Sequence, residues 1–129
     1  MVKLQNNKYF AGKFDGDQFK KYRYWFLGDF FEDGHPCKTD KVEVGYLKFR
    51  KGDFRPAHYH EKKMEVTIMF KGKMKNIVNG KEVIISSGEF LYVESKNVVS
   101  HEFLEDSEII TIHAPGILGD KVLVDDKNS

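Results

Sequence analysis

Cysteine is nearly absent from this chain: Cys37 is the one cysteine in 129 residues, so no internal disulfide can form. Such cysteine usage is typical of a reducing compartment, and we expect a cytoplasmic protein. Long apolar runs are missing as well. The N-terminus has no hydrophobic segment of the signal-peptide type, and no stretch approaches the ~18 apolar residues of a membrane span. We therefore expect no membrane partner.

An excess of charge of one sign is also missing. Lysine plus arginine total 21 and aspartate plus glutamate total 20, which leaves a formal net charge of +1. The lysines are spread along the chain, as on a solvated surface, and few of the cations are arginines. Both features argue against a nucleic-acid partner.

The periodicity of amphipathic helices is nearly absent too. Instead, short β-branched and aromatic runs alternate with turn residues, which predicts an all-β fold. The pair Asn79-Gly80 lies between two such runs and is the strongest hairpin signal in the chain. The expected strands cover residues 22–27, 42–49, 57–59, 65–71, 74–78, 82–85, 90–93, 98–104 and 109–113.

The length of the chain suits a single domain that buries one core. We expect the core barrel at about residues 42–115, preceded by an N-terminal strand or arm (1–41) and followed by a C-terminal tail (116–129). A closed barrel or a double-sheet jelly roll would hide the edges that so many short strands create.

Residues 52–72 (GDFRPAHYHEKKMEVTIMFKG) hold the side chains of a metal site between two glycines. Because side chains alternate along a strand, His58 and His60 face the same side. Glu65 follows after a turn-length interval and can return toward the same point, and His101 can join from a separate strand. Three imidazoles and a carboxylate suit one divalent transition metal (Fe, Mn, Ni, Cu or Zn) rather than Ca or Mg. The alternative is a polar surface turn, with the last histidine at an exposed strand end.

The same stretch resembles the first motif of the cupin superfamily: glycine, five residues, His-x-His, three or four residues, Glu, six residues, glycine. The matching positions are Gly52, His58, His60, Glu65 and Gly72. The second cupin motif reads glycine, five residues, Pro-x-Gly, two residues, His, three residues, Asn, and Gly88 and His101 match it. The departures are Glu94 for the proline, Lys96 near the glycine, two extra residues before the histidine, and Glu105 for the asparagine.

This resemblance implies a conical β-barrel, or double-stranded jelly roll, with one divalent metal held by His58, His60, Glu65 and His101. Many cupins are dimers, so it also implies a homodimer. The activities of the superfamily include dioxygenation, isomerisation, epimerisation, decarboxylation and lyase chemistry, besides plain ligand binding. The fold therefore implies a site rather than a reaction.

Five other residues have more than one interpretation. His113 ends an apolar run and is either a core or barrel-mouth histidine or an acid/base group near the metal. Tyr92 and Tyr46 are further acid/base candidates, and the strand register decides which face each one takes. His35 and Cys37 share one turn, where an ordinary surface loop is a simpler interpretation than a second metal site.

Functions from different classes fit these residues. The first is a metal-dependent enzyme that acts on a small polar molecule by oxygenase, isomerase/epimerase or lyase type chemistry. The alternative is a non-catalytic cupin that binds a metal or small ligand, and a third is a structural protein whose aromatic N-terminal segment pairs with a second copy. An enzyme should have a pocket with convergent polar groups, whereas a structural protein should fill its barrel with apolar side chains.

Overall fold

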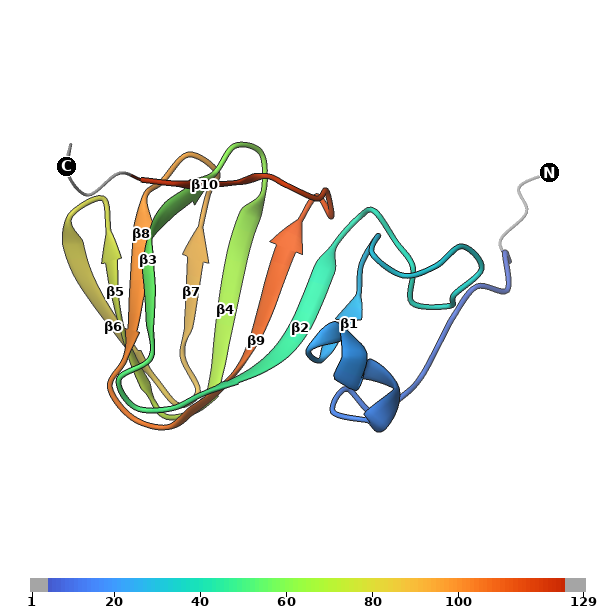
Figure 1. Ribbon diagram of the computed structural model, residues 1–129, viewed down its shortest axis with the longest axis horizontal. Coiled ribbons are helices and arrows are strands. Elements are labelled where there is room, and N and C mark those ends of the chain that lie inside the picture. Colours follow the sequence, from blue (N-terminus) through green and yellow to red (C-terminus); the bar gives the residue numbers. More distant parts are fainter. Residues whose placement is uncertain (1–4, 125–129) are drawn as a thin grey trace.

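Two antiparallel sheets of five strands each dominate the computed structural model, which describes residues 5–124 (Figure 1). The first sheet has the order β1-β2-β9-β4-β7. Its strands are β1 (Trp25–Leu27), β2 (Glu43–Phe49), β9 (Ser107–Ala114), β4 (Met64–Lys71) and β7 (Phe90–Val93). The second sheet has the order β10-β3-β8-β5-β6. Its strands are β10 (Lys121–Leu123), β3 (Phe54–His60), β8 (Val99–Phe103), β5 (Lys73–Val78) and β6 (Lys81–Ser86). The predicted all-β, double-sheet fold is confirmed.

Alternation along the strands decides what fills the space between the sheets. In β4, Glu65, Thr67 and Met69 are buried while the residues between them are partly exposed, as expected for a strand with one inward face. The register with β9 sets Glu65 opposite His113 and Met69 opposite Ile109. One end of the interior is therefore polar and the other apolar. The apolar core consists of Met69, Met74, Ile85, Phe103 and Ile109.

The observed strand boundaries differ from the predicted ones mainly in the second sheet. The strand β3 covers Phe54–His60 and is longer than the predicted strand 57–59. The strand β10 lies within the segment predicted as a C-terminal tail and pairs antiparallel with β3. It is too short, and too closely flanked by charged residues, to produce a recognisable pattern in the sequence. Residues 1–4 of the predicted arm and 125–129 of the predicted tail lie outside the described residues.

The segment before β2 lies beside the barrel and adds β1 to the edge of the first sheet (Figure 1). The 3-10 helix η1 (Asp17–Tyr22) precedes β1, so this strand begins at Trp25 rather than at residue 22 as predicted. The strand β1 pairs with β2, with Trp25 opposite Gly45. A Cβ at Gly45 would lie 2.6 Å from the indole, so glycine lets this ring approach the strand. The small core of the segment consists of Phe19, Phe31 and Cys37. Within residues 5–124, no helix has the length and apolar character needed to cross a membrane.

Candidate metal centre

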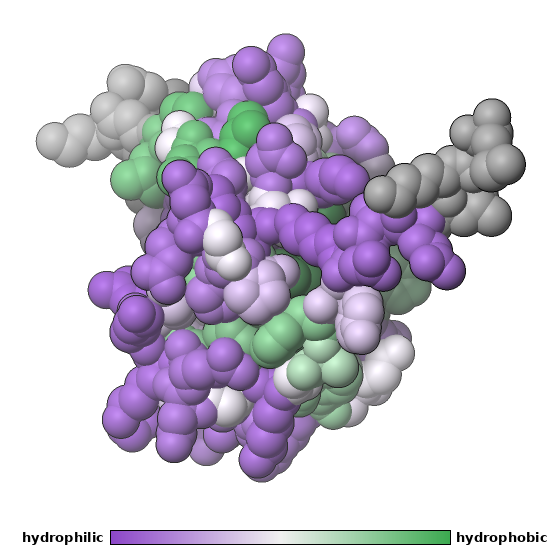
Figure 2. Space-filling model, turned by 90° about the vertical axis from the view of Figure 1, so that its right-hand side faces the viewer, coloured by the Kyte–Doolittle hydropathy of each residue, from purple (hydrophilic) through white to green (hydrophobic). Residues whose placement is uncertain are grey.

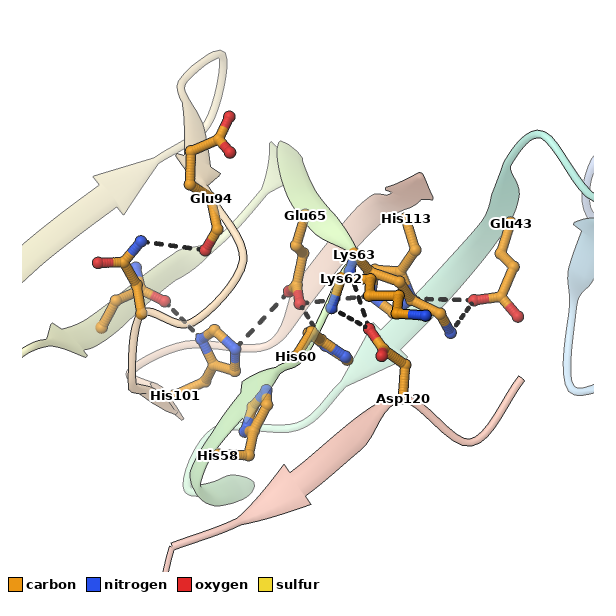
Figure 3. Close-up of polar contacts among 12 residues, drawn as sticks. Glu43, His58, His60, Lys62, Lys63, Glu65, Glu94, His101, His113 and Asp120 are labelled. Atoms are coloured by element: carbon orange, nitrogen blue, oxygen red, sulfur yellow. Dashed lines mark hydrogen bonds and ion pairs between the residues drawn. The ribbon is translucent and has the colours of Figure 1, made fainter. Parts of the chain in front are cut away.

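Three of the predicted ligands converge at the polar end of the interior (Figure 3). His58 and His60 lie on β3, whereas Glu65 lies on β4 of the opposite sheet. One possible ligand atom from each residue lies within 4.8 Å of the other two, and all three residues are buried. The partly exposed Tyr59 lies between the histidines, so both imidazoles take the inward face, as the alternation predicts.

The connection between β3 and β4 is held by Asp120, the residue before β10. Its carboxylate accepts the backbone N–H groups of Lys62 and Lys63 at 2.9 and 2.8 Å. These bonds fix the loop that reverses the chain between the two sheets. As a result His60 and Glu65 face each other, with Nε2 3.4 Å from Oε2.

His101 lies on β8 and is placed beside the same carboxylate. Its Nε2 lies 3.8 Å from Oε1 of Glu65, and its ring centroid lies 5.6 Å from that of His58. Burial lowers the pKa of His101 to about 4 and also lowers the pKa of His58, so both rings are neutral near pH 7. The structure therefore brings the fourth predicted ligand to the cluster, and its role as a ligand stays a prediction.

The hydrogen bonds of His58 and His101 leave the same ring nitrogen available. Nδ1 of His101 lies 2.6 Å from Oδ1 of Asn76, whose amide nitrogen donates to the carbonyl of Val83. Nδ1 of His58 lies 2.8 Å from the carbonyl oxygen of Pro56. Both partners are acceptors, so Nδ1 carries the proton and Nε2 keeps its lone pair, as a metal ligand must.

A lysine takes a glycine-like conformation in the turn before β8. Lys96 has a φ of +66°, in the left-handed region that glycine adopts at little cost. Its backbone N–H donates to the carbonyl of His60 at 2.8 Å, which ties the turn to β3. The side-chain amide of Asn97 donates to the carbonyl of Glu94 at 3.1 Å. The altered second motif thus still forms an ordered turn, and β8 still carries His101 to the cluster.

A buried chain of charged groups continues from the cluster to β2 (Figure 3). His113 lies between two carboxylates, with Nδ1 3.2 Å from Oε1 of Glu43 and Nε2 3.3 Å from Oε2 of Glu65. Lys63 contacts the same Glu43 oxygen at 2.7 Å. Burial lowers the pKa of His113, but its hydrogen bonds to the two carboxylates outweigh burial and raise the pKa. Burial raises the pKa of Glu65, but hydrogen bonds from His113 and His60 hold that pKa well below its usual range.

Three of these residues were not singled out from the sequence: Glu43, Lys63 and Asn76. Glu43 did carry a signal, because it shares a face of the predicted strand 42–49 with Gly45 and Leu47, where a buried carboxylate needs a partner. Lys63 lies in a predicted turn beside Lys62, and Asn76 follows Lys75 in a strand that begins with lysines, so no pattern marks either of them.

The two tyrosine candidates lie away from the cluster. Tyr46 takes the outer side of β2, where its hydroxyl donates to Glu108 and its ring packs against Phe14. Burial and the hydrogen bond to Glu108 raise the pKa of Tyr46 to about 12. Tyr92 is 49% exposed on β7, because the neighbouring Val93 takes the inward face. The strand register thus separates both hydroxyls from the possible metal ligands.

The loop with His35 and Cys37 uses both residues in local packing. Nδ1 of His35 accepts the backbone N–H of Cys37 at 3.0 Å, and its ring stacks on Phe31 with centroids 4.3 Å apart. Cys37 is buried rather than on the surface. Among the described residues, a group with metal-ligand spacing occurs only at the barrel cluster.

The cluster lines an inner chamber of about 130 Å³. Residues of the apolar core close one side of it, and its other polar groups come from Arg55, Thr67, Thr111, His113 and Lys121. An outer chamber of about 450 Å³ lies on the side of the N-terminal segment. The two chambers meet at the residues that line both of them, namely Trp25, His60, His113 and Lys121.

The donor set fits a divalent transition metal. Imidazole and carboxylate are ligands of such ions, and two of the imidazoles present an unprotonated Nε2. Nδ1 of His60 is buried and has no hydrogen-bond partner within residues 5–124, so this ring has a nitrogen that is not used in hydrogen bonding. The cluster of His58, His60 and Glu65 could therefore bind a metal ion.

Fold and cluster together define a class of protein: a double-stranded β-helix with a buried histidine–glutamate cluster between its sheets. A model of the Cupin domain family matches residues 45–113, and the chain belongs to this family. The match begins in β2 and ends in β9, so it contains the cluster but not the segment that carries η1 and β1. A comparison with curated proteins gave no match.

Solved structures of low sequence identity share the fold. A Klebsiella pneumoniae protein with a double-stranded beta-helix domain has a TM-score of 0.61 and 18% identity, over 68% of this chain and 78% of that one. Streptomyces Pac13, described as a nucleoside dehydratase, has a TM-score of 0.61 and 14% identity, over 67% and 70%. KdgF from Halomonas sp. has a TM-score of 0.58 and 21% identity, over 70% and 94%. At these identities the similarity supports the fold alone.

Proposed function

We propose that this cupin binds one divalent transition metal through His58, His60, Glu65 and His101 and acts on a small polar molecule. The observation that carries the proposal is the convergence of the first three side chains within 4.8 Å, in a chamber that adjoins a larger one. Such a metal, when bound, supplies Lewis acidity or, if it is iron or copper, redox chemistry. Oxygenase, isomerase/epimerase and lyase reactions all suit this ligand set.

The surrounding residues have separate roles in the proposal. Asn76 and the carbonyl of Pro56 keep Nδ1 of their histidines protonated and thereby orient Nε2. The apolar core excludes water from one side of the inner chamber. His113 holds a proton between two carboxylates and lines both chambers, where it could exchange that proton with a substrate.

The alternative is a cupin that binds a metal or small ligand without catalysis. One observation favours it, because Tyr46 and Tyr92, two of the three acid/base candidates, line neither chamber. Catalysis is favoured by the polar groups that converge on the inner chamber and by Pac13, a protein of similar fold described as a dehydratase. A purely structural role fits less well, since polar side chains fill part of the interior.

Elemental analysis of protein purified without an affinity tag tests the metal. We expect about one equivalent of a first-row transition metal per chain. His58→Ala and Glu65→Ala should lose it, while the matched control His35→Ala, outside the cluster, should keep it. Full occupancy in both cluster variants would refute the site, and full occupancy in His101→Ala would remove that residue from the ligand set.

Catalysis is tested by incubating metal-loaded protein with a panel of small polar molecules and following each one by mass spectrometry. Conversion that disappears in Glu65→Ala supports the enzyme. Binding without conversion across the panel supports the alternative. The homodimer and the cytoplasmic location expected from the sequence stay predictions.

A further inference from the structure

The outer chamber is built in part by the segment before β2, which lies outside the matched cupin domain. It is lined on one side by residues of η1 and β1 and on the other by the mouth of the barrel. Figure 2 views the molecule from the side of this segment, where hydrophilic side chains cover most of the face and hydrophobic ones come to the surface between them. A chamber made by a segment of this kind can select a ligand without any change in the metal cluster.

Positive charge dominates the lining of this chamber. The cations are Lys21, Arg23, Lys63 and Lys121. The two carboxylates of the lining, Glu43 and Asp120, already have partners: the first contacts Lys63 and His113, and the second accepts backbone N–H groups of the β3–β4 loop. Within the described part of the chain, no carboxylate lies within ion-pair distance of Lys21, Arg23 or Lys121. The chamber thus carries cationic groups that a ligand could engage.

The backbone beside the chamber adopts an uncommon conformation. Arg23 and Tyr24 are consecutive non-glycine residues with φ of +56° and +65°. Such residues are costly and persist where surrounding contacts hold them. Here the N–H of Arg23 donates to Lys20 at 3.0 Å and the N–H of Tyr24 donates to Phe19 at 2.9 Å. The turn leads the chain directly from η1 into β1, and both Arg23 and Trp25 line the chamber.

Trp25 is one of the residues that line both chambers. The centroid of its ring lies 5.5 Å from that of the His113 ring. Trp25 is the one tryptophan in the chain. Tyr22 and Phe30 add further aromatic surface to the outer chamber. Guanidinium and ammonium groups beside aromatic rings suit a ligand that combines an anionic group with a planar or apolar body.

We propose that the outer chamber binds the anionic end of a small organic acid or phosphate ester, with Arg23 and Lys121 as its main partners and Trp25 against its body. The inference rests on the proposed function, because the other end of this molecule would reach the metal cluster. Arg23 pairs with the oxygens of a carboxylate or phosphate, and Lys121, which lines both chambers, draws the ligand inward. The segment before β2 would then set the substrate class.

The indole offers a direct readout of occupancy. Protein as purified is titrated with phenyl phosphate, benzoate, benzyl alcohol and benzylamine, which share one ring and differ in charge, while tryptophan fluorescence is followed. We expect saturable changes with the two anions and binding about tenfold weaker, or weaker still, for the alcohol and the amine. Tighter binding of benzoate would indicate an organic acid, and tighter binding of phenyl phosphate would indicate a phosphate ester.

Variants test whether anion binding depends on the outer chamber and not on the metal site. Arg23→Gln combined with Lys121→Gln should weaken anion binding about tenfold or more and keep the metal content of the wild type, while the exposed control Lys81→Gln should change neither. Equal binding of anions and benzyl alcohol, or unchanged anion affinity in the double variant, would overturn the inference. If protein as purified contains no metal but still binds the anions, the proposed function is refuted and the chamber assignment stands.

Discussion

Three of the histidines around Glu65 differ in the group that holds their second ring nitrogen. His58 uses a backbone carbonyl, His101 a buried amide and His113 a carboxylate. A backbone carbonyl cannot be removed by substitution, whereas the amide of Asn76 can be changed without touching any predicted ligand. A substitution at Asn76 therefore tests whether the orientation of the His101 ring matters for metal binding, while the ring itself stays in place.

We expect Asn76→Ala to weaken metal binding about tenfold or more, because His101 loses the acceptor that keeps Nδ1 protonated. Asn76→Asp retains an oxygen acceptor and should keep more of the affinity. Competition with a metal-sensitive dye measures the affinity, and circular dichroism checks the fold. If the alanine variant binds metal as tightly as the wild type, His101 is not oriented by this amide.

The stability of the metal-free protein should depend on pH through His101. Its pKa is about 4 in the folded protein against 6.5 as the ordinary value, so the unfolded chain binds more protons between these values. The contribution of His101 to the free energy of unfolding is therefore largest above about pH 6.5 and falls as the pH is lowered toward 4. Between about pH 6.5 and 4.5 we expect His101 to account for a loss of about 2 kcal/mol.

Urea denaturation in the presence of a chelator measures this dependence. His101→Gln lacks the titrating ring and should lose less stability over the same interval. A pH dependence equal to that of the wild type would contradict the burial of a neutral imidazole at this position.

Among the elements, the turn between β7 and β8 departs most clearly from the family pattern. Lys96 holds a positive φ, and its N–H bonds to His60, so the turn connects the strand that carries two of the predicted ligands with the strand that carries the fourth. The conformation is kept by hydrogen bonds rather than by the residue type. A residue better suited to this φ should stabilise the turn.

We expect Lys96→Gly to raise the free energy of unfolding by about 1 kcal/mol, because glycine adopts a positive φ without the steric cost that a Cβ brings. Lys81→Gly, at the start of β6, is the matched control and should destabilise the protein, since glycine weakens a strand. Thermal unfolding of both variants measures the difference. A fall in stability for the first variant would mean that the lysine side chain contributes more than its backbone costs.

Elements with a clear local pattern could be predicted from the sequence. Alternating apolar runs and Asn79-Gly80 identified the strands of both sheets, because strand alternation and turn chemistry are local properties. The helix η1 and the strand β10 could not be predicted in this way. Each depends on contacts with distant residues: Phe19 packs against Phe31, and β10 pairs with β3.

The candidate site likewise has one part that the local sequence predicts and another part that depends on tertiary structure. His58, His60 and Glu65 lie close in sequence, so spacing alone indicated that they meet. His113 could be named as a candidate, but its position between Glu43 and Glu65 follows from the register of β9 with both β2 and β4. The outer chamber depends on how a segment without a family pattern folds beside the barrel, which no local signal describes.

At the scale of the whole molecule, the proposed metal ligands come from both sheets. The three histidines lie on β3 and β8 of the second sheet, and the carboxylate lies on β4 of the first. A bound ion would link the sheets at the polar end of the interior, where the apolar core does not extend. Binding of a metal ion should therefore raise the free energy of unfolding.

We expect saturating metal to stabilise the protein by about 3 kcal/mol at a free concentration of roughly 100 times Kd. The melting temperature should rise by roughly 10 °C relative to chelator-treated protein. Differential scanning calorimetry measures this shift, and His58→Ala should show little of it. Equal melting temperatures for the metal-loaded and chelated wild type would contradict a link between the sheets.

The order of strands in the sheets has a consequence for the synthesis of the chain. The central strand of the first sheet is β9 and that of the second is β8, yet both lie in the last third of the sequence. While the ribosome has made only the residues up to β7, β2 has no β9 to pair with and β3 has no β8. The nascent protein must therefore keep most of its strand edges exposed until β9 emerges, and it completes its barrel in one late step.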